Sequence, residues 1–528
     1  MSFLYRFLKR LLSIFSENEF QTTQKLNPND HAPQFPSLLQ GFNRRWYANN
    51  CLAVYLCYSA DGVQNALEEA IGLYGGAVKV KSGGHCYENF VFSEETRAII
   101  DVTGLDKVGY DDARGFYLGS GGTNWGAFKA LFRDYGKVLP AGSCYSVGLG
   151  GHICGGGYGL LSRLNGLTID WLTGVELVVK DNKDQPAKVI YVSKEDTGDE
   201  ADLFWAQTGG GGGNFGIITR YYFKTLPDAP NSAYITTFAF EWDQLTPAIL
   251  YDLLEWYRLF SADKNNWNQF GLFKLNHEAN GEIHLIIQTS VHQGMASAHE
   301  CESLMKMQSD ELNAICPHRA PQSPIVGHSS HYNPLMSVDN VNYTIYEATQ
   351  TLNGSGPNQR GKYKSAYMRK GFTMEDVQAI YKALKTVPAG VSATDMKQSL
   401  LQVDSYGGKI NTVPSDATAI PQRDSIFKLQ YQTYWSYEKN DAAFLGWIRD
   451  FYGAVYKNTG GTPNPALDPT NNVDGCYYNY PDVDLNDLVG AEGALQLYFL
   501  ENLDRLKRVK RRWDPNNYFN HAQSIPVV

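Results

Sequence analysis

The sequence predicts an α+β protein built from two lobes, on three observations. The chain has 528 residues, of which 43% are hydrophobic and 13% aromatic, enough to bury a large core and to form more than one lobe. Up to about residue 228, short strand-like runs alternate with helical runs. After Pro227 and Pro230 the strand-like runs lengthen, and long helical runs separate them.

The first lobe is predicted from runs of β-branched and aromatic residues bounded by turn residues, and from amphipathic runs between them. Strands are expected at residues 51–58, 77–81, 97–102, 115–119, 174–180, 188–192 and 217–223, and helices at 60–73, 125–135 and 202–208. The strand at 77–81 leads directly into a glycine-rich loop that contains a histidine. This loop is the first candidate for a functional site.

The second lobe is predicted to hold an antiparallel sheet. Strands are expected at residues 233–242, 270–275, 282–291, 399–406, 427–435 and 475–482, and helices at 247–260, 374–387 and 442–456. Alternating polar positions in the strands indicate a sheet that helices cover on one face, leaving the other face as the floor of a binding site. We divide the chain into an N-terminal arm (1–30), a first domain (31–228), a second domain (229–474) and a C-terminal segment (475–528) that returns to the first domain.

Two nucleophilic side chains lie in glycine-rich surroundings, His85 and Cys144. An imidazole nitrogen and a thiolate are the side-chain groups that can attach to the electron-poor edge of a flavin ring, at its 8-methyl carbon and at C6. Glycines allow the backbone to approach a flat ring and a pyrophosphate closely, and they permit positive φ. The glycines are Gly83, Gly84, Gly148, Gly150, Gly151, Gly155, Gly156, Gly157 and Gly159. The sequence therefore predicts a flavin anchored at two points.

Other interpretations of the same segment stay open. Cys144, His152 and Cys154 could bind a metal, although a second close pair of ligands is missing nearby. The run could also be a turn-rich loop without a ligand. A dinucleotide fingerprint formed by Gly211, Gly213 and Gly216 leads into a strand where a Rossmann fold requires a helix, so this match fails.

Charge and composition limit the classes of partner. The net charge of −9 and the isoelectric point near 5.7 argue against a nucleic-acid surface, so we expect no nucleic-acid partner. The 34 tyrosines and 10 tryptophans suit sugar rings, because their aromatic faces carry polar tips. Eight cysteines in a chain of this length do not indicate a disulfide framework, and spacing alone leaves open whether Cys301 and Cys316 pair.

The N-terminal residues 1–15 are apolar but contain three basic residues. The apolar stretch is too interrupted for a typical signal peptide and too short to span a bilayer. An amphipathic arm, an interfacial anchor and a weak targeting segment all stay open. We expect a soluble protein, with secretion or peripheral membrane attachment through this arm as alternatives, and the sequence leaves the compartment undetermined.

Polar side chains share one face of two predicted strands. Period-two alternation places Gln402, Asp404 and Tyr406 together on the first strand. On the next strand it places together Lys428, Gln430, Gln432 and Tyr434. Amides and a carboxylate among tyrosines suit vicinal hydroxyl groups, since each hydroxyl needs a donor and an acceptor. The alternative is an ordinary solvated sheet surface.

A third predicted strand, at 475–482, places Tyr477 and Asn479 on one face. A phenol could accept a hydroxyl proton, but with an unperturbed pKa near 10 a free phenolate at pH 7 costs about 4 kcal/mol. Catalysis would need a hydrogen-bond partner such as Asp404, or loss of the proton together with the hydride. Tyr477 could instead only pack the domain interface.

Seven segments of the chain together resemble one flavoprotein family. They are GFNRRW (from Gly41), SGGHCYENFVF (from Ser82), GSCYSVGLGGHICGGGYG (from Gly142), TGGGGGNFGIITRYYFK (from Thr208), NGSGPNQRGKYKSAYM (from Asn353), LQYQTYW (from Leu429) and GCYYNYPDVDL (from Gly475). The chain resembles, over nearly its whole length, the berberine-bridge-type branch of the vanillyl-alcohol-oxidase superfamily. The resemblance implies a PCMH-type FAD-binding fold over 31–228 and a substrate domain of antiparallel sheet covered by helices.

The resemblance implies FAD attached through two covalent bonds, from His85 to the 8α carbon and from Cys144 to C6. The further cofactor contacts that we expect are Ser82, Gly83, Gly84, Cys86, Tyr87, Val147, Gly148, Gly150, Gly151, His152, Gly155, Gly156, Gly157, Gly213, Asn214, Gly216, Ile218 and Asn479. Val147 would border the approach of oxygen to the flavin, and a small valine there agrees with an oxidase.

For the substrate side, the resemblance implies Tyr477 as the base and Tyr158 beside the substrate. Gln402 and Asp404 match a Gln-x-Asp pair of related oligosaccharide oxidases, which supports the substrate and the base. Residues Gln430, Gln432 and Tyr434 are further expected substrate contacts, with Gln432 the weaker transfer because Gln430 shares its face. The glutamate base of the berberine-forming members has no convincing counterpart, which favours sugar oxidation.

We therefore expect oxidation of the anomeric C1 hydroxyl of a hexose or disaccharide to a lactone, with O₂ reduced to H₂O₂. One alternative is a tailoring oxidase that acts on a sugar or ring of a secondary metabolite, and another is a non-catalytic binder of flavin or glycan. The expected partners are the sugar and O₂. The preferred sugar and the oligomeric state stay open, with a homodimer as one candidate.

Overall fold

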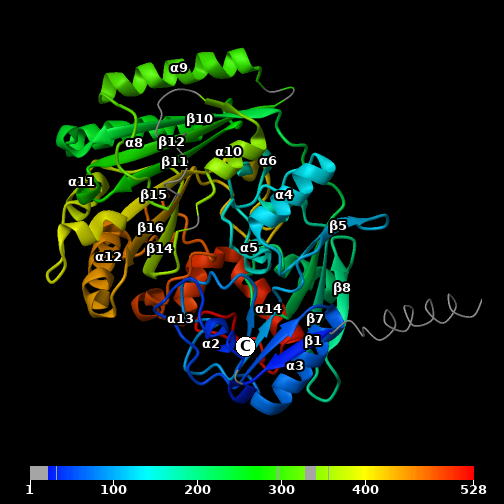
Figure 1. Ribbon diagram of the computed structural model, residues 1–528. Coiled ribbons are helices and arrows are strands. Elements are labelled where there is room, and N and C mark those ends of the chain that lie inside the picture. The colour runs from blue at the N-terminus through cyan, green and yellow to red at the C-terminus, as the bar shows by residue number, and fades with distance from the viewer. Residues whose placement is uncertain (1–21, 31, 293, 295, 328–340, 355) are drawn as a thin grey trace, which may run out of the picture.

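The computed structural model describes residues 22–30, 32–292, 294, 296–327, 341–354 and 356–528. Figure 1 shows a large sheet with its helices at the upper left, and two smaller sheets with theirs at the lower right. The predicted α+β class with two lobes is confirmed. The predicted domain boundaries follow this division but stay a prediction.

The two smaller sheets come from the first part of the chain. The four-stranded sheet has the order β1 (Thr23–Leu26), β2 (Ala53–Cys57), β4 (Ala98–Asp101), β3 (Val78–Lys81). The five-stranded sheet has the order β5 (Val108–Asp111), β6 (Gly115–Gly119), β9 (Ile217–Phe223), β7 (Gly174–Val179), β8 (Lys188–Ser193). Strand β1 pairs antiparallel with β2, although the sequence assigned residues 23–26 to the N-terminal arm. Its polar residues gave no strand signal.

Short helices connect these strands and position the loops of the site. They are α3 (Ala60–Tyr74), α4 (Asn124–Tyr135), α5 (Leu149–Cys154), α6 (Ser162–Asn165) and α7 (Gly198–Ala206). Ser59 and Thr123 cap α3 and α4, because each side-chain oxygen accepts a backbone N–H of the first turn. Helix α7 begins four residues before the predicted start, since the acidic residues of its first turn carry no apolar periodicity.

The large sheet is antiparallel throughout. Its order is β13 (Val341–Tyr343), β10 (Ser232–Glu241), β12 (Glu282–Val291), β11 (Gln269–Asn276), β15 (Leu400–Ser405), β16 (Phe427–Trp435), β14 (Arg360–Met368). One face packs on α8 (Pro247–Ala262), α11 (Met374–Leu384) and α12 (Asp441–Val455), which lie toward the left of Figure 1. Helices α9 (Ala298–Ile315) and α10 (Ile345–Thr351), with β13 and β14, were not predicted. The opposite face of the sheet carries the polar side chains of β15 and β16, together with apolar side chains of β10, β11 and β12 that pack into the other core cluster.

The predicted strand at 475–482 is wrong. Gly475 has φ +75°, and the N–H of Tyr480 donates to the carbonyl of Tyr477 at 2.9 Å, which makes a turn. Pro481 lacks an N–H for a strand ladder. We call residues 475–482 the tyrosine loop.

The chain after the tyrosine loop forms α13 (Asp484–Phe499) and α14 (Leu503–Trp513), and it lies against the first part of the chain. The ammonium of Lys510 donates to the carbonyl of Asn214 at 2.9 Å, and the N–H of Ile525 donates to the Asn214 side chain at 2.9 Å. Arg505 forms an ion pair with Asp202 at 2.6 Å. The C-terminal segment thus contacts residues that precede the large sheet in the sequence.

Cys301 and Cys316 do not pair. They lie near opposite ends of α9, and both are buried with free thiols.

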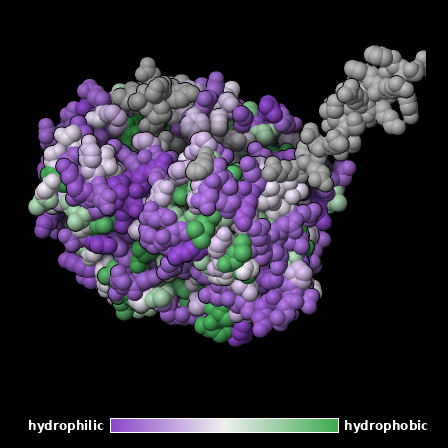
Figure 2. Space-filling view, turned by 60° about the horizontal axis from the view of Figure 1, so that its bottom comes forward, coloured by the Kyte–Doolittle hydropathy of each residue, from purple (hydrophilic) through white to green (hydrophobic). Residues whose placement is uncertain are grey.

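Within the described residues, none of the helices combines the length and apolar character needed to cross a bilayer. The predicted basic and apolar segment 1–15 lies outside the described residues. On the face that Figure 2 shows, described hydrophobic residues form small, scattered patches among hydrophilic ones.

A buried cluster of charges joins three segments that are distant in sequence. Lys362 and Lys364 of β14 contact Asp482 at 2.7 and 2.6 Å, and Lys362 also contacts Glu88 in the loop that follows His85. Lys364 contacts Asp484 at 3.0 Å. The side chains of the two lysines and of Glu88 are about 1% exposed. We call residues 82–88, which follow β3 and contain His85, the histidine loop. The cluster therefore holds the histidine loop and the tyrosine loop on the edge of the large sheet.

We predict that Lys362→Met lowers the free energy of unfolding by about 3–5 kcal/mol, because it leaves buried carboxylates without a counter-charge. Urea denaturation measures this change. Lys306→Ala is the control, since Lys306 pairs with Asp310 at a site where both side chains are more than two-thirds exposed. The control should leave stability nearly unchanged, and equal losses in the two variants would contradict a special role for the cluster.

Candidate functional site

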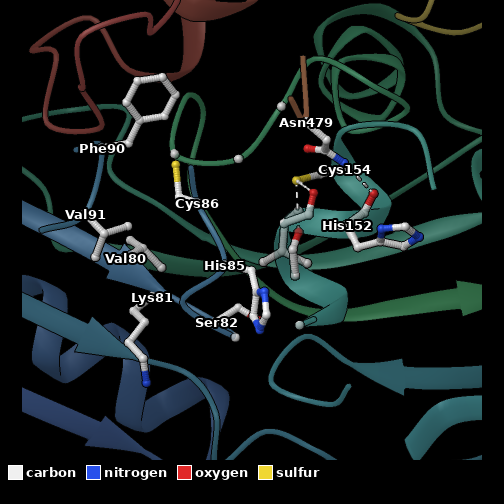
Figure 3. Close-up of a pocket in the computed structure, with 18 of the residues that line it drawn as sticks. Val80, Lys81, Ser82, His85, Cys86, Phe90, Val91, His152, Cys154 and Asn479 are labelled. Carbon is white, nitrogen blue, oxygen red and sulfur yellow. Dashed lines mark hydrogen bonds between the residues drawn. The ribbon is translucent and has the colours of Figure 1, made fainter. Parts of the chain in front are cut away.

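One cavity of about 330 Å³ is lined by the histidine loop, the glycine run after Cys144, residues 211–218, the tyrosine loop and residues 519–521. Figure 3 shows part of its wall, with His85, His152, Cys154 and Asn479. The predicted site residues that line it are Ser82, Gly83, Gly84, His85, Cys86, Tyr87, Cys144, Val147, Gly148, Gly150, Gly151, His152, Tyr158, Gly213, Asn214, Gly216, Ile218, Tyr477 and Asn479. Segments from opposite ends of the chain therefore form one site.

Gly155, Gly156 and Gly157 were predicted to contact the cofactor, but they do not line this cavity. They lie behind its wall. A Cβ at Gly155 would come within 2.0 Å of the Asn479 side chain, and one at Gly157 within 2.4 Å of Thr168. Gly155 thus lets the tyrosine loop pack closely against the turn that follows α5, and Gly157 lets the same turn pack against Thr168.

We call residues 142–148, which contain Cys144, the cysteine loop. Its backbone touches that of the histidine loop, where Gly83 meets Gly148. A Cβ on Gly83 would lie 2.3 Å from the nitrogen of Gly148, and one on Gly148 would lie 2.2 Å from the nitrogen of Gly83. Nearby, the Nε2 atom of His85 lies 2.8 Å from the hydroxyl of Ser146. This close approach brings His85 and Cys144 to the same cavity.

The surroundings of His85 keep its ring neutral. Burial lowers the pKa of His85 to about 4, and the ring stacks on Phe42 at 4.8 Å between centroids. At neutral pH one ring nitrogen therefore keeps a free lone pair, which is the form that can attack carbon. The Cys144 thiol donates to the carbonyl of Gly354 at 2.7 Å.

Two other thiols line the cavity in a different setting. Burial raises the pKa of both Cys86 and Cys154 to about 12, so both stay protonated at neutral pH. Cys154 donates to the carbonyl of Gly150 at 2.9 Å, and the Cys86 sulfur points away from the His85 ring in Figure 3. Neither thiol is held in the nucleophilic form.

The residues proposed as metal ligands have other partners. His152 accepts the N–H of Gly142 through Nε2 at 3.0 Å, while Cys154 is engaged by the backbone of its own helix. In the part of the chain that the structure describes, no three histidine, cysteine or acidic side chains come together as metal ligands would. The metal interpretation has no support there.

The cavity fits a flavin in shape and in polarity. A Cβ at Gly151 would meet no atom within 4 Å, so it would stand in the cavity itself. Asn124 lines the same wall, is 2% exposed, and has no partner for its amide nitrogen or its oxygen. A flat group with both donors and acceptors along its edge, as a flavin has, would satisfy such an amide.

Several lining residues escaped the sequence analysis. They are Lys79, Phe90, Asn124, Tyr480 and His521. Phe90 stacks on His521 at 4.1 Å, and the Lys79 ammonium binds the carbonyl of Asn520 at 2.6 Å. The last two contacts join residues more than 400 positions apart, so no local pattern could have shown them. Tyr480 lies in the segment GCYYNYPDVDL, three residues after Tyr477, and this motif is the signal in the sequence that points to it.

The polar face of the large sheet is buried, which excludes the interpretation as a solvated surface. Asp404 is 2% exposed and Lys428 is fully buried. The amide nitrogen of Gln402 donates to Asp404 at 2.7 Å, and Lys428 lies 3.4 Å from the other carboxylate oxygen. Lys428 also donates to the hydroxyl of Tyr480 at 2.8 Å. A chain of polar contacts thus runs from the sheet to the tyrosine loop.

A second chain runs from the same face to the histidine loop. The hydroxyl of Tyr434 donates to Gln432 at 2.9 Å, and Gln432 donates to Gln430 at 2.9 Å. Gln430 in turn donates to the hydroxyl of Tyr87 at 3.0 Å, and Tyr87 stacks on Tyr363 at 3.5 Å. The five sheet residues predicted as substrate contacts lie behind Tyr87 and Tyr480 and do not line the cavity; they are Gln402, Asp404, Gln430, Gln432 and Tyr434. Tyr406 lies beyond the end of β15, and its hydroxyl donates to the carbonyl of Gln422.

The tyrosines of the site differ in what holds their hydroxyls. Tyr477 accepts from the amide of Asn479 at 3.2 Å, and the expected bond to Asp404 is absent among the described residues. Tyr158 donates to the carbonyl of Ser405 at 2.6 Å, so its hydroxyl is tied to the backbone. Burial raises the pKa of all the cavity tyrosines, and only Tyr480 among these three has an ammonium at its oxygen.

Comparisons with known proteins show the family of this chain and its cofactor. Residues 51–183 match the family described as "FAD binding domain", and residues 476–526 match "Berberine and berberine like". The chain is 48% identical over 519 residues to hexose oxidase of Chondrus crispus, covering 95% of this chain and 94% of the relative. This chain belongs to the berberine-bridge-like family of FAD-linked oxidoreductases. Its fold is the PCMH-type FAD-binding fold, and its cofactor is FAD.

Two further relatives of the berberine-bridge-like family show its breadth. Aclacinomycin-N/aclacinomycin-A oxidase of Streptomyces galilaeus is 36% identical over 506 residues, covering 92% of this chain and 87% of the relative. A glycopeptide hexose oxidase, solved in complex with teicoplanin, superimposes with a TM-score of 0.83 at 32% identity, covering 96% of this chain and 99% of that one. The same fold thus serves enzymes named for free sugars and for larger metabolites.

Proposed function

We propose that this protein is an FAD-dependent carbohydrate oxidase that converts the C1 hydroxyl of hexoses and disaccharides to a lactone, with reduction of O₂ to H₂O₂. The observation that carries the proposal is the buried polar network of Gln402, Asp404 and Lys428 that ends on Tyr480 at the flavin cavity. Such a network provides a cation, a carboxylate and amides beside two phenols. The 48% identity to a hexose oxidase supports the same conclusion.

FAD, held by the residues that line the cavity, would supply an acceptor for the hydride of C1 and a route for the two electrons to O₂. The protein must hold the sugar and remove the proton from the C1 hydroxyl. Three phenols of the tyrosine loop line the cavity, Tyr477, Tyr478 and Tyr480. The hydroxyl of Tyr478 donates to the carbonyl of Gln523 at 3.2 Å, which leaves Tyr477 and Tyr480 as the two candidates. The resemblance supports Tyr477, while the contacts with Lys428 favour Tyr480 as the proton acceptor.

The electrostatics distinguish the two phenols. The ammonium of Lys428 lies 2.8 Å from the hydroxyl oxygen of Tyr480 and 4.0 Å from its ring centroid, against 5.0 Å from the ring of Tyr477. A cation at the oxygen favours the phenolate and opposes the effect of burial on the phenol pKa. Burial lowers the pKa of Lys428 to about 8 and raises the pKa of Tyr480 well above its ordinary value, so the proton stays on the phenol until the substrate hydroxyl and the cofactor are in place.

The attachment of FAD through both His85 and Cys144 is part of the proposal. Its support is the neutral ring of His85, the contact of the two loops at Gly83 and Gly148, and the presence of both side chains at one cavity.

A tailoring oxidase that acts on a sugar of a larger metabolite is the second candidate, favoured by the 36% identity to an aclacinomycin oxidase. The two candidates differ in the size of the substrate. Free sugars would be poor substrates for an enzyme that derives its specificity from an aglycone.

We predict that the holoenzyme releases H₂O₂ with free glucose, galactose, lactose or cellobiose. Removing the proton acceptor should lower kcat by about 10²–10⁴-fold, and we expect the larger loss in Tyr480→Phe than in Tyr477→Phe. Tyr437→Phe is the control, because Tyr437 is 65% exposed after the end of β16. A coupled peroxidase assay gives the rates.

No turnover of any free sugar, with turnover of a glycosylated metabolite, would move the function to the tailoring candidate. A larger loss in Tyr477→Phe would assign the base to Tyr477. Full activity in both variants would exclude Tyr477 and Tyr480 as the base.

We also predict that flavin stays with the wild-type protein after acid denaturation. His85→Ala and Cys144→Ala should each retain flavin through the remaining bond, and the double variant should release it. Cys86→Ala is the matched control, since this thiol lies in the same cavity next to His85. Absorbance of pellet and supernatant measures the outcome, and free flavin in the wild-type supernatant would contradict both bonds.

A further inference from the structure

Lys274 of β11 is a buried cation next to the proposed sugar site that the mechanism above does not use. It is 3% exposed, and its ammonium donates to the carbonyl of Val326 and to the Oε1 atom of Gln402, both at 2.8 Å. An ammonium can only donate hydrogen bonds. The amide oxygen of Gln402 must therefore face Lys274, and the amide nitrogen must point the other way.

The other end of that amide faces a carboxylate. The Nε2 atom of Gln402 donates to Oδ1 of Asp404 at 2.7 Å, and Oδ2 of Asp404 lies 3.4 Å from the ammonium of Lys428. A flipped amide would turn its nitrogen toward Lys274 and its oxygen toward Asp404, so that donor would face donor and acceptor would face acceptor. Lys274 thus determines which way the amide points.

The strand register makes this arrangement rigid. Lys274 of β11 lies directly opposite Gln402 of β15, and Asp404 lies directly opposite Lys428 of β16. Directly opposed residues on one face of an antiparallel pair have Cβ atoms about 4.5–5.5 Å apart. The series of polar contacts from Lys274 to Tyr480 therefore crosses three neighbouring strands, β11, β15 and β16, whose register is fixed by their hydrogen bonds.

We propose that Lys274 is a positioning residue, which fixes the Gln402 amide and through it the charge balance of Asp404, Lys428 and Tyr480. This inference rests on the proposed function, because it assigns a role in the same reaction. Among the described residues, Lys274 is not one of those that line the cavity, so we assign it a role through Gln402.

The charged groups around Lys274 determine in which direction the pH profile of activity shifts when Lys274 is replaced. Across β12 its partner is His284, whose pKa burial lowers, so that this ring is neutral at pH 7 while it contacts Glu282 at 3.0 Å. Burial lowers the pKa of Lys274 to about 8, while Asp404 across β15 and Cys144 of the cysteine loop raise it. Loss of the Lys274 charge removes one positive charge from this neighbourhood, which favours the protonated forms of Lys428 and Tyr480.

The test uses the holoenzyme with Lys274→Met. We expect kcat/KM for the sugar to fall about 10- to 100-fold, as for loss of a hydrogen bond to a charged group. The rising limb of the pH profile should move to higher pH by on the order of one unit. Lys180→Met is the control, because Lys180 is also buried and pairs with Glu68 away from the cavity. The control should keep both kcat/KM and the pH midpoint.

A double variant separates positioning from general destabilisation. If Lys274 acts through Gln402, Lys274→Met combined with Gln402→Met should be no slower than Gln402→Met alone. Additive losses, or an unmoved pH midpoint, would overturn the inference. If Lys274→Met does not fold, Lys274→Gln, which lacks the charge, carries the same test of the pH midpoint.

A crystal structure of the Lys274→Met holoenzyme gives a readout that does not depend on turnover. We expect the Gln402 amide to leave Asp404, and an unmoved Gln402–Asp404 bond would overturn the inference. A wild-type enzyme that oxidises no free sugar would instead count against the proposed function, and the crystal structure would still decide the role of Lys274.

Discussion

The buried ion cluster of Lys362, Lys364, Glu88 and Asp482 is the contact on which the geometry of the site depends. Glu88 follows His85 by three residues, and Asp482 follows Tyr480 by two. Both carboxylates contact lysines of one edge strand, β14. A buried charge without its partner is costly, so the three segments form this cluster together or lose several kcal/mol. The cofactor end and the substrate end of the site thereby acquire a fixed relation.

The two lobes share one apolar core, in which Ile235, Leu272 and Ile286 of the large sheet belong to the same cluster as residues of the first lobe, and they also meet through polar contacts. On its outer face the large sheet packs on helices with ordinary hydrophobic residues. On its inner face it buries lysines, amides and a carboxylate, whose burial requires that each finds a partner. Those partners include Tyr480 and Tyr87, which also line the flavin cavity. Burial of this face therefore creates the chemical setting of the site, because it places an ammonium against a phenol away from bulk water.

Sequence reasoning predicted the fold class, most strands and the presence of His85 and Cys144 at one site, because these depend on local patterns. Period-two alternation found the face that carries Gln402 and Asp404, and glycine density found the loops around His85 and Cys144. It failed where the determinant is a distant contact. The tyrosine loop contains a strand-like run of aromatic residues, yet its backbone turns at Tyr477, and Asp482 is held by β14.

Local sequence patterns also could not predict which side chains contact one another. Asp404 was expected to assist Tyr477, but it contacts Gln402 and Lys428, because the strand register sets its neighbours. Lys274 lies 128 residues before Gln402, and no spacing rule connects them. Gly155 and Gly157 belong to the glycine run that marks the site, yet they serve packing behind its wall.

The most direct test of the central claim is the rate of flavin reduction by glucose carrying deuterium at C1, measured without oxygen in a stopped-flow instrument. The account predicts that the sugar bleaches the flavin absorbance and that deuterium at C1 slows this bleaching several-fold, because the C1 hydrogen leaves in the same step. Bleaching at an unchanged rate with the C1-deuterated sugar, or no bleaching by any free hexose, would contradict it.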